Sequence, residues 1–209
     1  FNLGLQIDTI QRTYPLVDLY AIVDPQGTLH FVRSQHIVDF VDGQRQLESS
    51  VDFPFGRNGI EIGTISALDT HLFDGELMVA AAQDTALVLR KYANTELGFD
   101  LGTARQVTLN AGFVVTKLFI GPRNQWLYAL GDAGEIEIFG TGNFRKPTRI
   151  YRGSLVQPDE QMTAVTALLG RYSLVVATDN NKTTQFGIYT DALATRIDAI
   201  RQFDTQTPV

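Results

Sequence analysis

The chain has 209 residues, of which 44% are hydrophobic and 19% charged, and its formal net charge is −6. This acidic balance argues against nucleic acid as a partner, because proteins that follow phosphate backbones carry basic patches or stripes. The absence of cysteine excludes disulfides and thiolate metal sites.

One pattern recurs four times along the chain. An apolar strand leads into a tight turn that contains aspartate, and an alternating second strand follows. The predicted hairpins cover residues 19–32, 77–89, 127–139 and 174–188. Their turn aspartates, at positions 24, 84, 132 and 179, are separated by 60, 48 and 47 residues. Propeller blades repeat every ~40–50 residues, so the last two intervals fit and the first requires an insertion, which we expect in the turn-rich residues 42–60.

The turn sequences indicate how the hairpins close. Asp24 and Asp132 each enter a turn that ends in glycine, at Gly27 and Gly134. We expect each carboxylate to accept a backbone N–H two residues on, while glycine takes the positive φ.

Further strands flank the hairpins. Residues 65–68, 113–120 and 162–169 precede the second, third and fourth hairpins, whereas residues 106–109 and 148–151 follow the second and third. The repeat therefore has about four strands, which is typical of a propeller blade. The alternative is a β-sandwich of unrelated hairpins, which also shows short, evenly spaced strands.

We predict an all-β, β-propeller-like (WD40-like) fold of about four blades, with residues 1–209 forming one domain or a partial propeller. Four blades either close into the smallest ring or belong to a larger ring that continues beyond Val209. Residues 1–8 alternate as an edge or closing strand would. At the other end, Leu193, Ile197, Ile200 and Phe203 have helical spacing but take the place of an outer strand, and we favour the strand.

No residue pattern indicates catalysis, a cofactor or a metal. His30, His36 and His71 form no ligand motif, and no G-x-S-x-G nucleophile elbow occurs. Glu135 and Glu137 alternate with isoleucines, so we expect them on the wet face of a strand. We predict a non-enzyme; the rival is a propeller hydrolase or lyase whose acids converge in the central channel.

Two features bear on binding. A basic run, Arg145, Lys146, Arg149 and Arg152, is a candidate docking patch for a partner, the alternative being a solvated strand and loop. Trp126 opens the third hairpin, and we expect it to be a core or inter-blade anchor.

The third and fourth repeats, residues 126–139 and 172–186, carry a resemblance. They resemble the repeats in the extracytoplasmic insertion of phosphate ABC-transporter permeases of gamma-proteobacteria. The resemblance is one of repeat style over about half of the chain. It implies a propeller-type module and transfers no catalytic or phosphate-binding residue to this sequence.

The resemblance implies a function as a non-catalytic interaction or regulatory domain of such a permease, on the periplasmic side of the inner membrane. The expected partner is a protein, either a periplasmic substrate-binding protein or a transporter subunit. No stretch of the chain approaches the ~18 apolar residues of a membrane span, so we expect the anchor of the parent protein to lie outside this sequence. The alternative is a free-standing WD40-like interaction scaffold in the cytoplasm.

Overall fold

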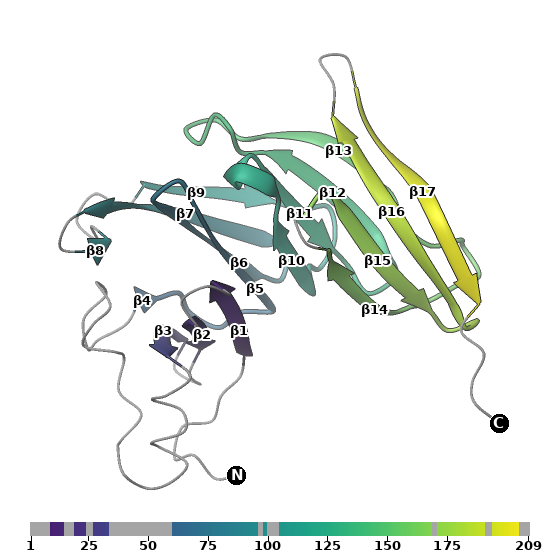
Figure 1. Cartoon of the computed structure of the whole chain (residues 1–209), viewed down its shortest axis with the longest axis horizontal. Coiled ribbons are helices and arrows are strands. Elements are labelled where there is room, and N and C mark those ends of the chain that lie inside the picture. Colours follow the sequence, from purple (N-terminus) through teal and green to yellow (C-terminus); the bar gives the residue numbers. More distant parts are fainter. Residues whose placement is uncertain are drawn as a thin grey trace, which may run out of the picture. The chain divides into compact units, whose positions relative to one another are not determined.

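The computed structural model describes residues 9–14, 19–23, 27–33, 60–95, 98–99, 105–168, 171–190 and 194–204. Within these ranges the regular structure consists of strands and a single turn of 3₁₀ helix, η1 (Pro122–Asn124) (Figure 1). None of the helical structure in these ranges is long and apolar enough to cross a membrane. The all-β prediction is confirmed.

The strands form four antiparallel sheets that follow the chain order. The first sheet holds β1 (Thr9–Tyr14), β2 (Leu19–Val23), β3 (Thr28–Arg33) and β4 (Ile60–Glu61). The second holds β5 (Ala67–Phe73), β6 (Glu76–Gln83), β7 (Ala86–Thr95) and β8 (Gly98–Phe99), with β9 (Arg105–Asn110) pairing with β7. The third holds β10 (Lys117–Ile120), β11 (Trp126–Leu130), β12 (Glu135–Gly140) and β13 (Thr148–Ser154). The fourth holds β14 (Met162–Ala167), β15 (Ser173–Thr178), β16 (Lys182–Thr190) and β17 (Thr195–Asp204).

The four predicted hairpins are therefore β2–β3, β6–β7, β11–β12 and β15–β16, each at the centre of its own sheet. Strands flank them as the repeat predicts, and each sheet is an up-and-down meander. The C-terminal segment is the long strand β17, which confirms the strand over the helix for that region. Residues 42–59 of the predicted insertion, the edge strand at residues 1–8, Asp24 and His36 lie outside the described residues, and residue 60 begins β4.

The chain divides into two compact units. One comprises Phe1–Gln83 and Val88–Thr108, and the other comprises Asp84–Leu87 and Leu109–Val209. The second unit contains the β10–β13 and β14–β17 sheets. The single-domain organisation over residues 1–209 stays a prediction.

The core of the second unit lies between its two sheets. Alternate residues of β11 and β12 pack against alternate residues of β15 and β16, because successive side chains of a strand point to opposite faces. The cluster consists of Tyr128, Leu130, Ile136, Ile138, Leu155, Leu174, Val176 and Ile188, all buried. Partly buried side chains, Trp126 and Ile197 among them, extend it at its margins. This face-to-face packing fixes the β10–β13 and β14–β17 sheets against each other.

The turns follow the predicted chemistry in part. Gly27 and Gly134 take positive φ values of 79° and 81°, as expected for glycine in these turns. In the second hairpin the aspartate itself takes the left-handed conformation, with φ 56° at Asp84. Asp179 bonds to the start of the neighbouring strand: its Oδ1 accepts the Gln161 N–H at 3.0 Å, and its N–H donates to the Gln161 carbonyl at 3.0 Å. This aspartate joins two segments of the sheet because Gln161 lies beside it across the strands.

Candidate functional site

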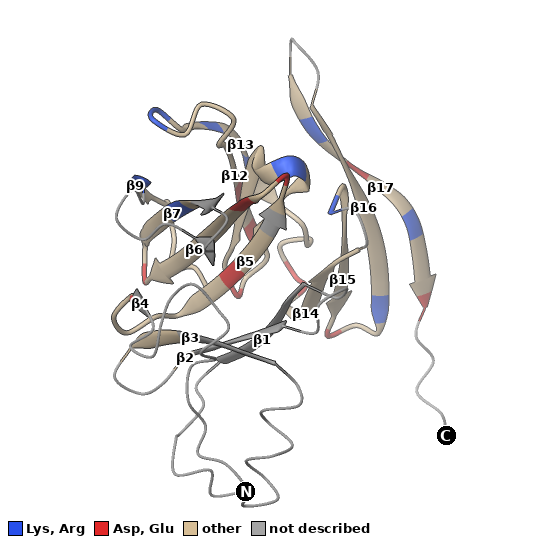
Figure 2. Ribbon diagram, turned by 60° about the vertical axis from the view of Figure 1, so that its left-hand side comes forward, with Lys and Arg blue, Asp and Glu red and all other residues tan. Residues whose placement is uncertain are grey.

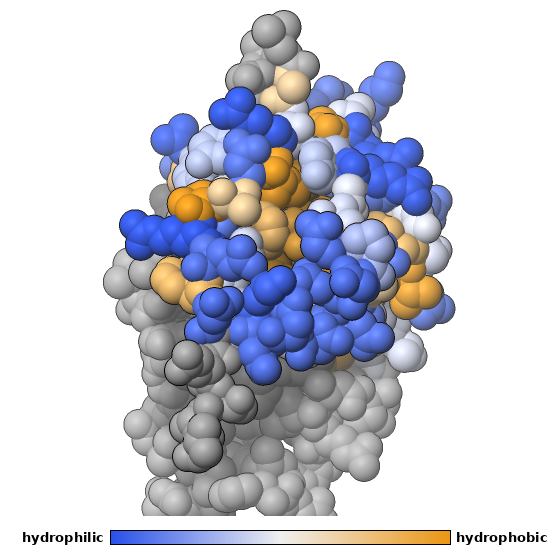
Figure 3. Space-filling view, turned by 90° about the vertical axis from the view of Figure 1, so that its right-hand side faces the viewer, coloured by the Kyte–Doolittle hydropathy of each residue, from blue (hydrophilic) through white to orange (hydrophobic). Residues whose placement is uncertain are grey.

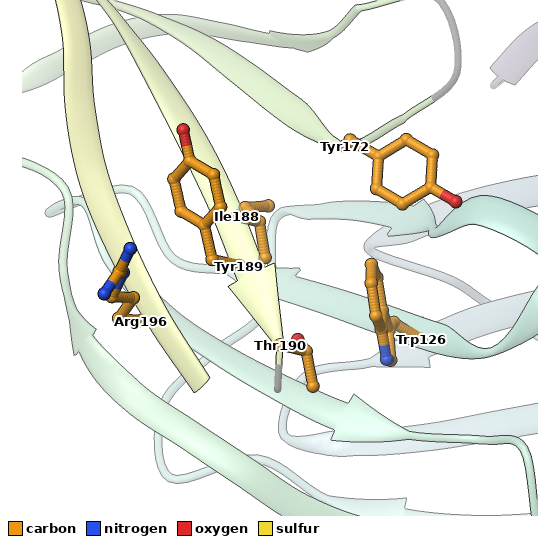
Figure 4. A pocket seen from close by; sticks show the side chains of 6 residues that line it. All are labelled: Trp126, Tyr172, Ile188, Tyr189, Thr190 and Arg196. Atoms are coloured by element: carbon orange, nitrogen blue, oxygen red, sulfur yellow. The ribbon is translucent and has the colours of Figure 1, made fainter. Parts of the chain in front are cut away.

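A hollow of about 370 Å³ lies at the end of strand β16 in the second unit. Trp126 starts β11, Tyr172 precedes β15, Thr190 ends β16 and Arg196 lies near the start of β17, so these residues belong to one end of the two sheets. Its full lining is Trp126, Tyr172, Ile188, Tyr189, Thr190 and Arg196 (Figure 4). We call this group the aromatic hollow.

Two aromatic rings form one side of the aromatic hollow. Trp126 meets Tyr172 edge to face, with ring centroids 5.8 Å apart and an interplanar angle of 80°. This geometry brings the positive edge of one ring to the negative face of the other and is favourable for aromatic pairs. Trp126 also lies 6.5 Å from the ring of Tyr128, at the margin of the core. The predicted role of Trp126 as an anchor between successive sheets agrees with these contacts.

Two hydrogen bonds from side chains to backbone carbonyls fix the segment that carries Tyr172. The buried Tyr128 hydroxyl donates to the Arg171 carbonyl at 3.0 Å, and the Arg171 guanidinium donates to the Ile120 carbonyl at 2.9 Å. Arg171 itself has a positive φ of 57°, which turns the chain into β15. Burial, followed by the neighbouring Tyr172, raises the pKa of Tyr128 well above its ordinary value. The hydroxyl therefore remains a neutral donor, and Tyr172 is positioned by its neighbour in sequence.

The other side of the aromatic hollow carries charge. The Arg196 guanidinium carbon lies 5.2 Å from the centroid of the Tyr189 ring, a cation–π contact. Arg196 Nε also lies 3.0 Å from Asp198 Oδ2, and both side chains are largely exposed. Basic and acidic positions alternate along β17 (Figure 2). Arg196 thus lies beside the Tyr189 ring with most of its side chain exposed to solvent.

The predicted basic patch is divided between two environments. Arg149 and Arg152, on β13, approach Glu137 Oε1 at 2.9 and 3.5 Å. Arg145 and Lys146 are exposed in the β12–β13 loop, whose Thr141 donates its hydroxyl to the Asn124 carbonyl at 2.7 Å. The structure therefore brings two of the four predicted residues onto one buried carboxylate and leaves two on a loop. A docking role for this group stays a prediction.

The expectation that Glu137 lies on a wet face is wrong. Its side chain is 0% exposed, and its second carboxylate oxygen accepts the Gly112 N–H at 3.3 Å. Both faces of β12 are buried, so alternation with isoleucine does not mark a solvent face here. The carboxylate is retained because the two arginines and the backbone donor compensate for its burial.

His71 lies on β5, whereas the His30 side chain and His36 are not among the side chains that the structure describes. Among the described residues there is no group of three or more His, Cys, Asp or Glu side chains that could hold a metal ion.

The sequence contained only part of the signal for the aromatic hollow. The sequence pattern indicates Trp126 but not Tyr172, Tyr189 and Arg196, because these three residues come from different segments of the chain. A usable signal was their position: each of them lies at the beginning or end of a strand, at the same end of the repeat.

No protein-family model and no curated protein matches the sequence. Solved structures do match in fold. A proposed 6-phosphogluconolactonase from Bacteroides fragilis aligns with a TM-score of 0.59 and 12% identity over 96% of this chain and 55% of its own. Hsv2 from Kluyveromyces lactis aligns with a TM-score of 0.54 and 11% identity, over 97% of this chain and 71% of its own. A Lactobacillus plantarum protein aligns with a TM-score of 0.51 and 14% identity, over 92% and 56%.

The chain thus spans little more than half the length of the Bacteroides and Lactobacillus proteins. At such low identity the likeness shows the fold alone. The matched structures are β-propeller-like proteins, and the sheets of this chain are successive four-stranded meanders of the same kind. The chain is an all-β protein with a β-propeller-like fold.

Proposed function

We propose that this chain is a non-catalytic interaction module that binds a protein partner through the aromatic hollow. The observation that carries the proposal is the grouping of Trp126, Tyr172, Tyr189 and Arg196 at one end of two packed sheets. Tryptophan, tyrosine and arginine are the residues most enriched at the energetic centres of protein interfaces. Tyr172 is 51% exposed although its neighbours hold its backbone in place, so it is rigid and accessible at once.

The charge of the module favours a particular kind of contact. An apolar or aromatic side chain of the partner fits beside Trp126 and Tyr172, while a carboxylate beside it receives the outward guanidinium donors of Arg196. Arg145 and Lys146 would extend this contact with exposed positive charge. The partner surface is therefore expected to combine an aromatic or aliphatic side chain with acidic groups.

The finer proposal places the module in the periplasm, as the extracytoplasmic insertion of a phosphate ABC-transporter permease. Its support is the resemblance of the third and fourth repeats to those insertions. The partner would then be the periplasmic phosphate-binding protein or another transporter subunit. The coarser alternative is a free-standing WD40-like scaffold with an unrelated partner.

The single tryptophan of the chain makes the proposal measurable, because Trp126 lies in the hollow and is the only indole. The chain is titrated with a purified periplasmic phosphate-binding protein whose tryptophans have been replaced, so that Trp126 is the only emitting indole in the mixture. A saturable change in the emission of Trp126 is expected. Tyr172→Ala and Arg196→Ala should each weaken binding by ten-fold or more, whereas Phe73→Ala, an exposed aromatic of the other unit, should not.

Two results would count against the proposal. Binding that is unchanged in both Tyr172→Ala and Arg196→Ala would remove the hollow from the interface. No binding to the phosphate-binding protein, together with binding to another protein that these substitutions weaken, would retain the module and overturn its place beside a transporter.

The enzyme alternative is tested in parallel. The Bacteroides protein that shares the fold is described as a proposed 6-phosphogluconolactonase. The chain is assayed for hydrolysis of 6-phosphogluconolactone against the spontaneous rate, and no acceleration is expected. Acceleration that scales with protein concentration would replace the interaction module with a hydrolase.

A further inference from the structure

The β14–β17 sheet has one face packed and one face open. Its inner face contributes Leu174, Val176 and Ile188 to the core against the β10–β13 sheet. The opposite side chains of the same strands form what we call the outer face. Pairing places them together: Val175 is opposite Gln185, Ala177 is opposite Thr183, and Thr183 is opposite Phe203.

The outer face carries apolar side chains that are exposed. Ile200 and Phe203 on β17 are 47% and 53% exposed. Ile200 occupies a bulge in β17 and lies over Gly187 together with Tyr189, since a Cβ placed on Gly187 would meet both side chains within 2.8 Å. The side of the molecule that carries β17 shows apolar surface bordered by hydrophilic residues (Figure 3).

The repeat itself shows what such a face packs against. Aligning the turn aspartates Asp132 and Asp179 makes Val175 and Ala177 the counterparts of Tyr128 and Leu130. In the preceding sheet, Tyr128 and Leu130 are fully buried, and the surface that buries them is the next sheet along the chain.

The same correspondence holds on the outer strands. Phe203 is paired with Thr183 as Gly153 is paired with Ile136, so Phe203 is the counterpart of Gly153. In the same way Arg201 is the counterpart of Tyr151, which packs against the core cluster. The outer face of the β14–β17 sheet therefore corresponds to the face on which the β10–β13 sheet receives its successor.

We infer that the outer face is an inter-sheet interface that receives a further four-stranded antiparallel sheet of the same repeat type. The incoming sheet would present aliphatic side chains at positions equivalent to Leu174 and Val176, which are the ones that cover Tyr128 and Leu130. Thr183, Gln185 and Arg201 make this interface more polar than the preceding one, so its apolar contacts centre on Val175, Ala177 and Phe203. A protein of this fold has room for a further sheet, because this chain covers only 55% of the Bacteroides protein that it matches.

Cysteine labelling tests the inference, because the chain has no cysteine of its own. Single variants Ala177→Cys and Phe203→Cys are compared with Asn143→Cys, an exposed position in the β12–β13 loop. Maleimide labelling is measured by mass spectrometry for residues 1–209 alone and for the natural polypeptide that carries this sequence. In the natural polypeptide, labelling at positions 177 and 203 is expected to slow by ten-fold or more, while labelling at position 143 stays the same. If one of these variants fails to fold, it is replaced by Val175→Cys, whose side chain lies on the same outer face.

Equal labelling rates in the two settings would overturn the inference. Slow labelling of positions 177 and 203 in residues 1–209 alone would also overturn it. If that slow rate depends on protein concentration, a second copy of the chain covers the face. If the rate does not depend on concentration, another part of the same chain covers it. Positions 175, 177 and 203 do not belong to the aromatic hollow. Tyr189 is shared between the hollow and the border of the outer face, so the inference is scored only at the labelled positions and the proposed function only by the Trp126 titration.

Discussion

Arg149 Nη1 donates to Glu137 Oε1 at 2.9 Å, and this carboxylate is completely buried while the arginine is 46% exposed. Arg152 and the Gly112 N–H approach the same carboxylate. One acidic side chain thus ties the segment before β10 and the outer strand β13 to the middle of the sheet. Four predictions follow from contacts of this kind.

Glu137→Ala should be strongly destabilising. Removing the carboxylate leaves the Gly112 N–H without its acceptor and two arginines beside a cavity, for which we expect a loss of about 2–4 kcal/mol in the free energy of unfolding. Asp198→Ala, which removes the exposed partner of Arg196, should cost less than about 1 kcal/mol. Urea denaturation measures both. A Glu137→Ala variant as stable as Asp198→Ala would show that the buried ion pairs contribute little.

Gly134→Ala should destabilise the third hairpin. Gly134 has φ 81°, and an added Cβ would lie 2.5 Å from a methyl carbon of Val156, so both the backbone and the side-chain space oppose it. We expect a cost of about 1–3 kcal/mol. Gly142 is the matched control, because a Cβ there meets nothing within 4 Å. Thermal unfolding compares the two variants, and an equal melting temperature would contradict the assignment of this turn.

Glu160→Gln should weaken the dependence of stability on acid pH. The Gln157 N–H, then the Asn180 and Lys182 side chains, hydrogen bond to the carboxylate and hold the pKa of Glu160 below its ordinary 4.5. A depressed folded pKa gives stability that is present above the unfolded value and is lost as pH falls through the folded one. Denaturation midpoints from about pH 6 to about pH 3 measure this loss. A Glu160→Gln slope equal to that of the wild type would be the contrary result.

Tyr128→Phe should loosen the aromatic hollow. The Arg171 carbonyl loses its hydroxyl donor, and we expect a loss of about 1–2 kcal/mol. Because burial raises the pKa of Tyr128, the neutral hydroxyl contributes stability below the ordinary value of 10.0, and this contribution is lost as pH rises above it. Tyr128→Phe should therefore show a smaller fall in stability at alkaline pH. A Tyr128→Phe variant whose stability falls as steeply as that of the wild type at alkaline pH would contradict this expectation.

The aromatic hollow shows how far sequence reasoning reaches for the site. Trp126 could be singled out, since it is the only tryptophan and it opens a predicted strand. Tyr172 and Arg196 could not, because their nearness depends on how the β14–β17 sheet stacks on its neighbour and on the turn at Arg171. The basic run was visible as a cluster along the chain, but pairing across β12 and β13 directs Arg149 and Arg152 onto Glu137.

The class of the fold and the positions of its hairpins follow from the residue pattern alone. Alternating apolar residues, aspartate and glycine at the turns, and a period near 47 residues act locally, so they can be recognised without knowing the long-range contacts. The burial of polar side chains and the meeting of aromatic rings, in contrast, depend on tertiary packing. These properties arise from face-to-face packing of sheets, which joins residues distant in sequence and can bury a glutamate whose local pattern indicates exposure.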